Sequence, residues 1–232
     1  MTESRHKRSG GNQRFPELYP ILDAELVLRG LGADPQQRRS VLRRIVQELA
    51  AAGVEILQYR NKRDEDEVVA ADARAMQEAA GQAALTPMRL ILNDRAALVP
   101  AVGWDGVHVG QQDLPPRQAR LLVRESALVG LSTHNEEQLI AADREPVDYI
   151  AIGPVFATAS KRDTSPIIGL DGVRRARALT RKPLVAIGGI TLKTAASVYA
   201  AGADSLAVIA AIFAAPGRSP AQSAKDFLEI FS

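Results

Sequence analysis

Eight short apolar runs, each followed by a stretch with helical character, constrain the fold of this chain more than any other feature. The runs are, in order, Tyr19–Leu22, Val54–Arg60, Leu90–Leu92, Gly106–Val109, Leu128–Leu131, Asp148–Gly153, Leu184–Ile187 and Ser205–Ile209. Most are continuously apolar rather than alternating, which is typical of parallel strands covered on both faces. Eight strand–helix repeats in 232 residues predict a single-domain α/β fold, the (β/α)8 or TIM barrel.

Capping signals mark where several of the helical stretches begin. Asp34 and Ser219 are each followed by proline, which predicts a helix N-cap with proline at the first helical position. Thr133 and Glu136 have the spacing of a capping box, which predicts a helix start at Thr133. No linker, charge block or shift in composition divides the chain, so we assign these helices to one domain.

The first fourteen residues differ in character from the rest of the chain. They are polar and basic, include a pair of glycines and lack the apolar core of a secretory signal. We therefore predict a disordered polar leader over residues 1–14 and a TIM-barrel catalytic domain over residues 15–232.

Composition narrows the classes of partner and the compartment. Charged residues make up 24% of the chain and nearly cancel to a net charge of +2, which does not favour nucleic acid or an anionic membrane. No apolar stretch is long enough to span a bilayer. The absence of cysteine excludes disulfides and thiolate metal sites and favours the cytoplasm. We therefore expect small-molecule partners, and a homo-oligomer is compatible with the sequence.

Polar residues and glycines gather at the ends of six of the apolar runs. In chain order they are Gln58, Arg60 and Lys62; Asn93 and Asp94; Asp113; Ser132; Thr158 to Lys161; and Gly188 with Gly189. In a barrel of strand–helix repeats, all strand carboxyl ends open on one face, and that face carries the active site. The clusters therefore predict a single pocket that holds carboxylates and cations together.

Two aspartates suggest a metal site in this pocket. Asp94 follows the third run and Asp113 the fourth, so both carboxylates would lie on one rim of the barrel. Two hard oxygen ligands, with water and phosphate oxygens completing the shell, suit Mg²⁺. The alternative is that Asp94 caps the next helix and Asp113 lies in a turn. Their position on neighbouring strand ends, opposite cations, favours the metal.

Three cations suggest a diphosphate in the same pocket. Arg60 and Lys62 lie at the end of the second run and Lys161 in the loop after the sixth. Together with Mg²⁺ they would stabilise the charge of a departing diphosphate. Exposed side chains on flexible loops are the alternative, and for Lys161 the two interpretations are evenly balanced. For Arg60 we prefer the functional interpretation, because an unpaired charge inside an apolar strand is costly.

A glycine pair suggests a second phosphate site. Gly188 and Gly189 follow the seventh run, and Ile209 and Ala210 end the eighth. The loops after strands seven and eight are the recurrent phosphate site of this barrel. The alternative is a tight turn before Thr191. The position of the glycines in the eightfold pattern favours the phosphate.

Two histidines outside the leader have less specific surroundings. His108 alternates with valines inside the fourth run, and we interpret it as a structural residue. His134 follows the fifth run, where it is either a neighbour of a helix cap or a general acid or base. We prefer the first of these.

Taken in order, these clusters resemble the motifs of the thiamine phosphate synthase family. The resemblance runs from about Tyr19 to Ile212 and is carried by Gln58–Lys62, Asn93–Arg95, Asp105–Pro115, Gly130–His134, Gly153–Lys161 and Ala186–Ile190. Each motif is modest alone, and all of them together at the predicted strand ends are specific.

The resemblance implies a (β/α)8 barrel that condenses hydroxymethylpyrimidine diphosphate with a thiazole phosphate through a pyrimidine carbocation. By resemblance, Arg60, Lys62 and Lys161 are catalytic, and Asp94 and Asp113 bind Mg²⁺. The pyrimidine diphosphate would contact Gln58, Tyr59, Arg60, Asn61, Lys62, Asn93, Ser132 and Lys161. The thiazole phosphate would contact Thr158, Ala159, Ser160, Gly189, Ile209 and Ala210.

The chain departs from the family pattern at a few positions. Asn61 stands where the family usually has Glu, Ser160 where it has Thr, Ala210 where it has Ser, and Ala157 where it has Pro. Two alternatives follow. One is a thiazole tautomerase with the same barrel, which would use His134 and needs no diphosphate–metal site. The other is a non-catalytic binder of thiamine-pathway ligands, which only Asn61 favours.

Overall fold

A computed structural model describes residues 14–30, 34–83, 87–158 and 165–231 of the chain. Most of the predicted leader lies outside these residues, as do three predicted substrate residues, Ala159, Ser160 and Lys161. Arg14, the last residue of the predicted leader, pairs with Glu17 and donates a hydrogen bond to the Tyr199 hydroxyl. The division of the chain between leader and barrel therefore stays a prediction.

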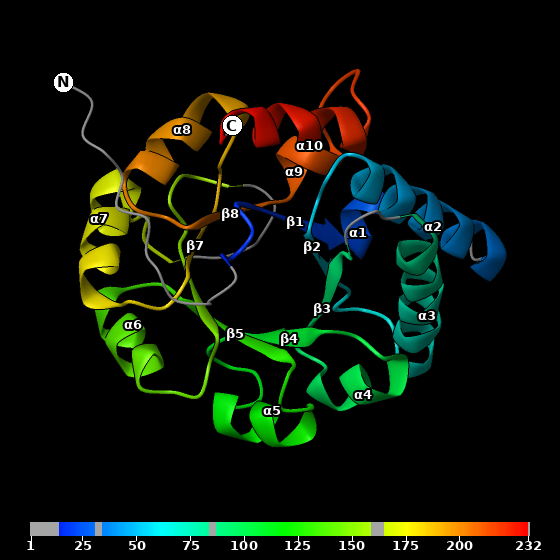
Figure 1. Cartoon of the computed structure of the whole chain (residues 1–232), viewed down its shortest axis with the longest axis horizontal. Helices are drawn as coiled ribbons and strands as arrows, with labels where there is room; N and C mark the ends of the chain where they lie inside the picture. Colours follow the sequence, from blue (N-terminus) through cyan, green and yellow to red (C-terminus); the bar gives the residue numbers. More distant parts are fainter. Residues whose placement is uncertain (1–13, 31–33, 84–86, 159–164, 232) are drawn as a thin grey trace.

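Eight parallel strands close into a barrel in the order of the sequence, which confirms the predicted TIM barrel (Figure 1). Strand β1 pairs with β2 on one side and with β8 on the other, so the barrel has no free edge. The strands are β1 (Leu18–Asp23), β2 (Ile56–Arg60), β3 (Arg89–Asn93), β4 (Gly106–Val109), β5 (Leu128–Thr133), β6 (Tyr149–Ile152), β7 (Leu184–Ile187) and β8 (Ser205–Val208).

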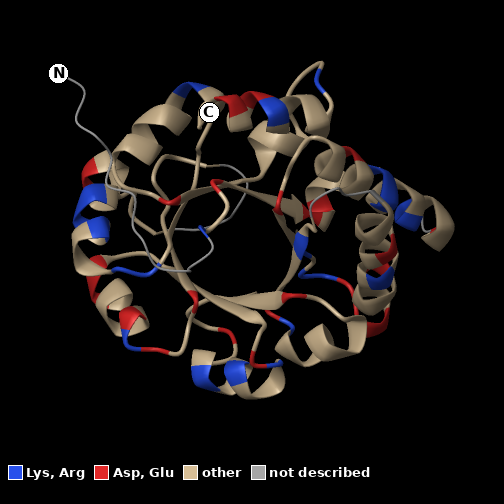
Figure 2. Cartoon of the chain, viewed as in Figure 1, with Lys and Arg blue, Asp and Glu red and all other residues tan. Residues whose placement is uncertain are grey.

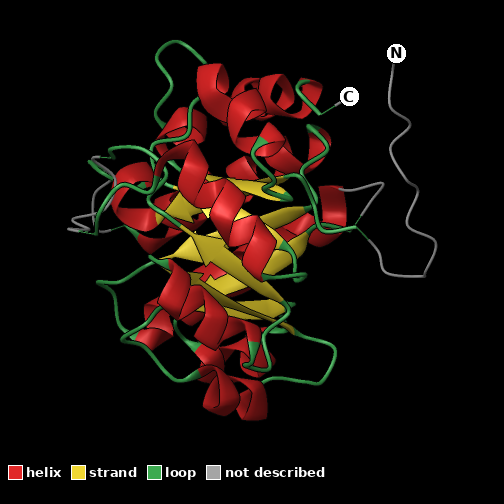
Figure 3. Ribbon diagram, turned by 90° about the vertical axis from the view of Figure 1, so that its left-hand side faces the viewer, coloured by secondary structure: helices red, strands yellow, loops and turns green. Residues whose placement is uncertain are grey.

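Helices surround the barrel and cover its outer face (Figures 1 and 3). Those of the described part of the chain are α1 (Ala24–Val27), α2 (Pro35–Ala51), α3 (Asp66–Ala83), the 3-10 turn η1 (Ala96–Leu98), α4 (Val99–Val102), α5 (Pro116–Leu122), α6 (Glu136–Asp143), α7 (Gly169–Leu179), α8 (Leu192–Ala200), α9 (Ala210–Phe213) and α10 (Pro220–Glu229). Because each strand runs in the same direction, all the loops that follow the strands meet at one end of the barrel.

Two of the predicted helix starts are confirmed and one is wrong. The Asp34 carboxylate accepts from the backbone N–H of Gln36, and Ser219 forms a capping box before α10. Thr133 does not begin α6. It is the last residue of β5 and donates its hydroxyl to the Ala151 carbonyl at 2.8 Å, while Asn135 supplies the cap. Strand β5 runs two residues beyond its apolar run, which places Thr133 in the sheet.

Alternating side chains along each strand fill two apolar cores. One core lies inside the barrel and includes Tyr19, Tyr149 and Phe15, and the other lies between the strands and the helices. Successive residues of a strand point to opposite faces, so neighbours in sequence serve different cores. In β2, Gln58 points into the barrel and contacts Tyr19, whereas Tyr59 belongs to the outer core.

Charged residues of both signs are interspersed over the outer helices (Figure 2). The chain has 29 Lys and Arg residues and 27 Asp and Glu residues, so the two signs of charge are present in nearly equal numbers. In the described ranges, none of the helices has the length and hydrophobicity needed to cross a bilayer.

Candidate active site

The end of β2 carries a buried ion pair that the sequence pattern did not reveal. Arg60 pairs with Asp23 at the end of β1, and Asp23 is only 5% exposed. Asp23 also accepts from the backbone N–H groups of Glu25 and Leu26 and so caps α1. Arg60 is therefore not the unpaired charge that the apolar run suggested. Adjacent strand register brings the two residues together, since Asp23 and Arg60 are direct partners in the ladder.

The two predicted metal ligands lie next to each other at the barrel rim. Asp94 directly follows β3, and its carboxyl group is hydrogen-bonded to that of Asp113 in the loop after β4. Lys62 Nζ lies 3.1 Å from Asp94 Oδ2. Asp113 Oδ2 also accepts from the backbone N–H of Gly110 at 2.8 Å. The structure thus brings Lys62, Asp94 and Asp113 into one cluster.

Backbone geometry directs Asp94 toward this cluster. Its φ of 64° lies in the left-handed region, and it is the one non-glycine residue with positive φ in the described chain. Its backbone N–H donates to the His108 carbonyl on β4 at 2.8 Å. A left-handed conformation is uncommon for a residue other than glycine, although Asp and Asn tolerate it best. The strain is consistent with a functional constraint on the Asp94 carboxylate.

The proximity of the two carboxyl groups shifts their pKa values in opposite directions. Burial raises the pKa of Asp94, and the adjacent Asp113 raises it further against the opposing effect of Lys62. Burial would also raise the pKa of Asp113, but hydrogen bonds from Asp94 and from the Gly110 N–H outweigh it and lower that pKa. Two carboxyl groups that share a site repel each other when both are ionised, and the neighbouring Lys62 offsets part of that repulsion.

This donor set fits a hard divalent cation. Two carboxylate oxygens close together suit Mg²⁺, which keeps several waters and completes its shell with substrate phosphates. Within the described ranges there is no group of three or more acidic or histidine side chains that would form a complete protein cage. A cation at Asp94 and Asp113 would therefore have coordination positions left for phosphate oxygens.

Buried polar atoms without partners also face this part of the barrel wall. Within the described residues, Arg60 Nε and Asn93 Nδ2 are buried and have no hydrogen-bond partner. Asn93 ends β3, directly before Asp94, and is 8% exposed. Unsatisfied buried donors are rare and call for an explanation such as a missing ligand. Both are donors, which suits an anionic or acceptor-rich ligand.

Ser132 and Gln58, two of the predicted substrate contacts, lie on the inner face of the barrel. Ser132 Oγ lies 2.8 Å from His108 Nε2, and His108 Nδ1 lies 3.0 Å from the Tyr149 hydroxyl. Gln58 Nε2 donates to the Tyr19 hydroxyl at 3.0 Å. The His108 side chain is buried, and each of its ring nitrogens lies within hydrogen-bonding distance of a hydroxyl group. These contacts are in keeping with its interpretation as a structural residue.

Two predicted substrate contacts, Tyr59 and Asn61, have side chains that turn away from the barrel interior. The Tyr59 side chain is fully buried outside the barrel, where its hydroxyl donates to Asp72 Oδ2 at 2.6 Å. Asn61 Nδ2 donates to the Tyr59 hydroxyl and to Asp64 Oδ2. The cause is the twofold alternation of strand side chains, which turns both residues away from Gln58 and Arg60. Neither side chain faces the pocket.

His134 makes contacts that suit the start of a helix. Its backbone N–H donates to Gln138 Oε1 at 2.8 Å, and its ring Nδ1 lies 2.9 Å from the Gly153 carbonyl. Both contacts hold the connection between β5 and α6. They agree with the preferred interpretation of His134 as the neighbour of a helix cap.

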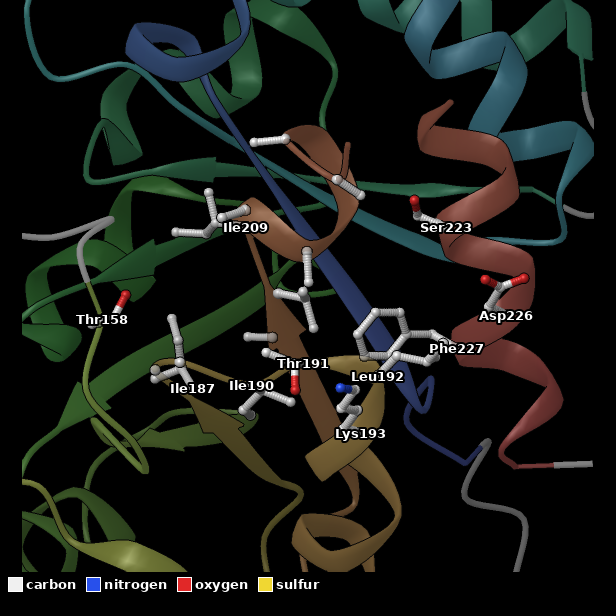
Figure 4. A pocket seen from close by; sticks show the side chains of 18 of the residues that line it. Thr158, Ile187, Ile190, Thr191, Leu192, Lys193, Ile209, Ser223, Asp226 and Phe227 are labelled. Carbon is white, nitrogen blue, oxygen red and sulfur yellow. The ribbon is translucent and has the colours of Figure 1, made fainter. Parts of the chain in front are cut away.

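A cavity of about 710 Å³ opens beside the ends of β7 and β8. Figure 4 shows Thr158, Ile187 and Ile209 on one side of it and α10 on the other. Four of the predicted thiazole-phosphate residues line this cavity, namely Thr158, Gly189, Ile209 and Ala210. The prediction that these segments meet at one site therefore agrees with the geometry.

Glycine is required in the wall of this cavity. Gly188 and Gly189 have φ values of 103° and 61°. A Cβ on Gly189 would lie 2.4 Å from the Ala157 carbonyl oxygen, and one on Gly188 would lie 2.6 Å from Pro154. No side chain fits at either position without moving backbone. The backbone after β7 can therefore approach a ligand closely.

Comparisons with known proteins show which family this chain resembles. A family model described as "Thiamine monophosphate synthase" matches residues 32–212. A thiamine-phosphate synthase of Koribacter versatilis (strain Ellin345) is 48% identical over 218 residues, which are 94% of this chain and 96% of that protein. A thiamine-phosphate synthase of Chloroflexus aurantiacus is 40% identical over 198 residues, or 85% of each chain.

A solved structure has a similar fold. Thiamine phosphate pyrophosphorylase from Pyrococcus furiosus matches 92% of this chain and 94% of its own, with a TM-score of 0.77 and 25% identity. The family model covers most of the chain, and the relatives match it over nearly its whole length. The chain therefore belongs to the thiamine monophosphate synthase family.

Proposed function

We propose that this protein condenses a hydroxymethylpyrimidine diphosphate with a thiazole phosphate and releases pyrophosphate. Membership of the family makes the protein a transferase of thiamine biosynthesis. The observation that carries the chemical assignment is the cluster of Lys62, Asp94 and Asp113, together with a cavity that has glycine backbone in its wall at the same end of the barrel. The cluster suits a metal-bound diphosphate, and the cavity suits a second phosphate.

The proposed pyrimidine-diphosphate site occupies the ends of β2 to β5. Arg60 and Lys62 bind the diphosphate, and Asn93 contributes a buried donor that has no partner within the described chain. Lys161, outside the described residues, is proposed as the third cation. Mg²⁺ held by Asp94 and Asp113 supplies positive charge against the diphosphate oxygens when it is bound.

The proposed thiazole-phosphate site is the cavity at the ends of β7 and β8. Backbone N–H groups of Gly189, Ile209 and Ala210 bind the phosphate, in the recurrent phosphate position of this barrel. Thr158 adds a hydroxyl from the loop after β6. Ala159 and Ser160 are proposed as further contacts of the same phosphate, and both lie outside the described residues.

The proposed reaction is dissociative. The bond between the pyrimidine methylene carbon and the diphosphate oxygen breaks with its electron pair on the oxygen, and pyrophosphate departs against Arg60 and Lys62. The thiazole nitrogen then donates its lone pair to the methylene cation and forms the new C–N bond. No protein base is needed in this sequence, so placement and electrostatic stabilisation account for most of the rate enhancement.

The test is pyrophosphate release by the purified protein with both substrates and Mg²⁺. We expect release to require all three, and Lys62→Met to lower kcat/KM about 10-fold or more through loss of a charge-assisted contact. Arg63→Met is the matched control, because Arg63 is the next residue but pairs with Glu25 on the exposed side. Equal losses in both variants would argue against a diphosphate contact by Lys62.

Two other outcomes would redirect the assignment. Interconversion of thiazole phosphate tautomers without pyrophosphate release, abolished by His134→Ala, would support the tautomerase. Binding of both substrates without turnover would support a non-catalytic binder. We also propose a cytoplasmic location, on the basis of the cysteine-free composition.

A further inference from the structure

The end of β1 holds a buried carboxylate to which the proposed reaction gives no role. We infer that Asp23 is a positioning residue, which fixes the Arg60 guanidinium at the barrel mouth before the diphosphate arrives. This inference rests on the proposed function, because it assumes that Arg60 contacts the diphosphate. It extends the pyrimidine-diphosphate site to β1, a strand that contributes none of the predicted substrate contacts.

The register of the barrel places both side chains on its inner face. Tyr19, Ile21 and Asp23 alternate along β1, and the first two belong to the core inside the barrel. Ile56 belongs to the same core, and the alternation of β2 puts Arg60 on the same face as Ile56. Asp23 and Arg60 are direct ladder partners, so they are the last inward-facing residues of two neighbouring strands.

The two carboxylate oxygens of Asp23 have different partners. Its Oδ1 accepts from the backbone N–H groups of Glu25 at 3.0 Å and Leu26 at 3.3 Å, which anchors the side chain to the first turn of α1. Its Oδ2 accepts from Nη1 of Arg60. Asp23 is only 5% exposed, and the Arg60 side chain is 15% exposed. A carboxylate that the backbone fixes through one oxygen can therefore fix a guanidinium through the other.

This contact uses only part of the Arg60 guanidinium. Nη1 faces Asp23, whereas the buried Nε has no hydrogen-bond partner in the described part of the chain. A guanidinium is planar and carries its N–H donors in a fixed arrangement, so holding one nitrogen sets the direction of the others. Without Asp23, binding of the diphosphate would have to order this long side chain, and that ordering reduces affinity.

A purely structural role for Asp23 is the alternative, since the same side chain caps α1. The two roles use different oxygen atoms, so a substitution can separate them. Asparagine caps helices about as well as aspartate and keeps an oxygen that can accept from the backbone N–H groups of α1. It replaces Oδ2 with an NH2 group, which cannot accept a hydrogen bond from Arg60.

The experiment is a calorimetric titration of the whole protein with inorganic pyrophosphate at a fixed Mg²⁺ concentration. We expect Asp23→Asn to raise the Kd for pyrophosphate about 10-fold, the scale of one hydrogen bond to a charged group. In steady-state kinetics the KM for the pyrimidine diphosphate should rise by a similar factor, and the KM for the thiazole phosphate should stay within about twofold. Asp34→Asn is the matched control, because Asp34 caps α2 from an exposed position and should leave all three constants unchanged.

A double-mutant cycle tests whether Asp23 acts through Arg60. Arg60→Met removes the guanidinium, so a further Asp23→Asn change should alter the Kd for pyrophosphate by less than about twofold. The double variant should also unfold at a higher denaturant concentration than Arg60→Met alone, because that single variant leaves a buried carboxylate without its cation. If Asp23→Asn fails to fold, Asp23→Ser supplies a capping oxygen without the carboxylate and takes its place.

Three results would overturn the inference. The first is an unchanged Kd for pyrophosphate in Asp23→Asn. The second is an equal loss of binding from Asp23→Asn in the wild-type and Arg60→Met backgrounds, which would mean that Asp23 has a structural role only. The third is a wild-type protein that does not bind pyrophosphate. Pyrophosphate binding without turnover of the two substrates would instead refute the proposed function, and the binding cycle would still decide the role of Asp23.

Discussion

The two halves of the barrel mouth are lined by different kinds of chemical group. The half that follows β1 to β5 consists of charged and amide side chains, and its cations are already paired with carboxylates, as in Arg60–Asp23 and Lys62–Asp94. The half that follows β7 and β8 is a cavity in which glycine backbone and apolar side chains follow the strands, and Lys193, Arg218 and Asp226 are the charged residues among those that line it. The first half is rich in charge, and the second offers shape and backbone N–H groups.

This difference indicates how each half distinguishes its ligand. Side-chain charges must be compensated before a ligand arrives, because an isolated buried charge is costly, so a ligand in the first half exchanges partners within an existing network. Backbone in the second half carries no net charge to compensate, and at Gly188 and Gly189 it leaves no room for a Cβ. We therefore expect charge substitutions to dominate in the first half and volume substitutions in the second.

The largest expected effect comes from removing charge in the first half. Asp94→Asn should lower kcat by about 100- to 1000-fold, the scale of losing one preorganised electrostatic contact. Asn also tolerates the left-handed backbone at this position, so the fold should be retained. Steady-state kinetics at varied Mg²⁺ concentration measure the effect. Asp171→Asn on the exposed face of α7 is the control, and unchanged Mg²⁺ dependence in Asp94→Asn would contradict the metal site.

The second effect tests volume in the other half. Gly189→Ala should raise the KM for the thiazole phosphate about 10- to 100-fold, because the new Cβ meets the Ala157 carbonyl and strains the backbone. The KM for the pyrimidine diphosphate should change little. Gly217→Ala is a close control, since Gly217 has a similar φ of 68° and its added Cβ would meet nothing within 4 Å. A similar kinetic change in both variants would show that backbone strain alone is responsible.

The third effect concerns the outer support of the charged half. Asn61→Glu, toward the residue usual in the family, should lower the free energy of unfolding by about 1–3 kcal/mol, since two donated hydrogen bonds are lost and a second carboxylate faces Asp64. Chemical denaturation measures it. The double variant Asn61→Glu with Asp64→Asn should recover much of the loss, and no recovery would mean that repulsion is not the cause.

The same contact predicts a pH dependence with a definite sign. The Asn61 hydrogen bond is the main cause that lowers the pKa of Asp64 in the folded protein. A lowered folded-state pKa contributes stability above the unfolded value of about 3.9, and that stability is lost as the pH falls through the folded-state pKa. The contribution is small because the Asp64 side chain is 37% exposed. Asn61→Glu should therefore flatten the acid limb of the stability profile below about pH 4.

The sequence predicts the barrel well because its strands are read from local patterns. All eight apolar runs overlap a strand, and the ends of those strands place Asp94, Asp113 and Gly189 where the parallel topology requires. The sequence pattern did not show which face of a strand each residue of a motif occupies. Tyr59 and Asn61 belong to a motif that includes Gln58 and Arg60, yet the strand's alternation points them at Asp72 and Asp64 instead.

Contacts between residues that are distant in sequence could not be predicted from local patterns either. The pairing of Arg60 with Asp23 depends on the register between β1 and β2, which no local pattern specifies. The same holds for the link between Tyr19 and Tyr149, which lie 130 residues apart and meet only because the barrel closes. Asp23 carried one usable signal, since it is a carboxylate directly at the end of the first apolar run.

The smallest expected effect tests whether an added side-chain hydroxyl improves binding of the thiazole phosphate in the cavity after β7 and β8. Ala210 is the first residue of α9 and lines the cavity, and the family usually has Ser at this position. Ala210→Ser adds one hydroxyl without a large change in volume, so one further hydrogen bond to the phosphate should lower the KM for the thiazole phosphate about 3-fold. Ala211→Ser, one residue further along the same cavity wall, is the control. If only Ala210→Ser improves KM, the hydroxyl acts on the phosphate; if both or neither do, the backbone alone determines binding in this half and the side chain at residue 210 has no specific role.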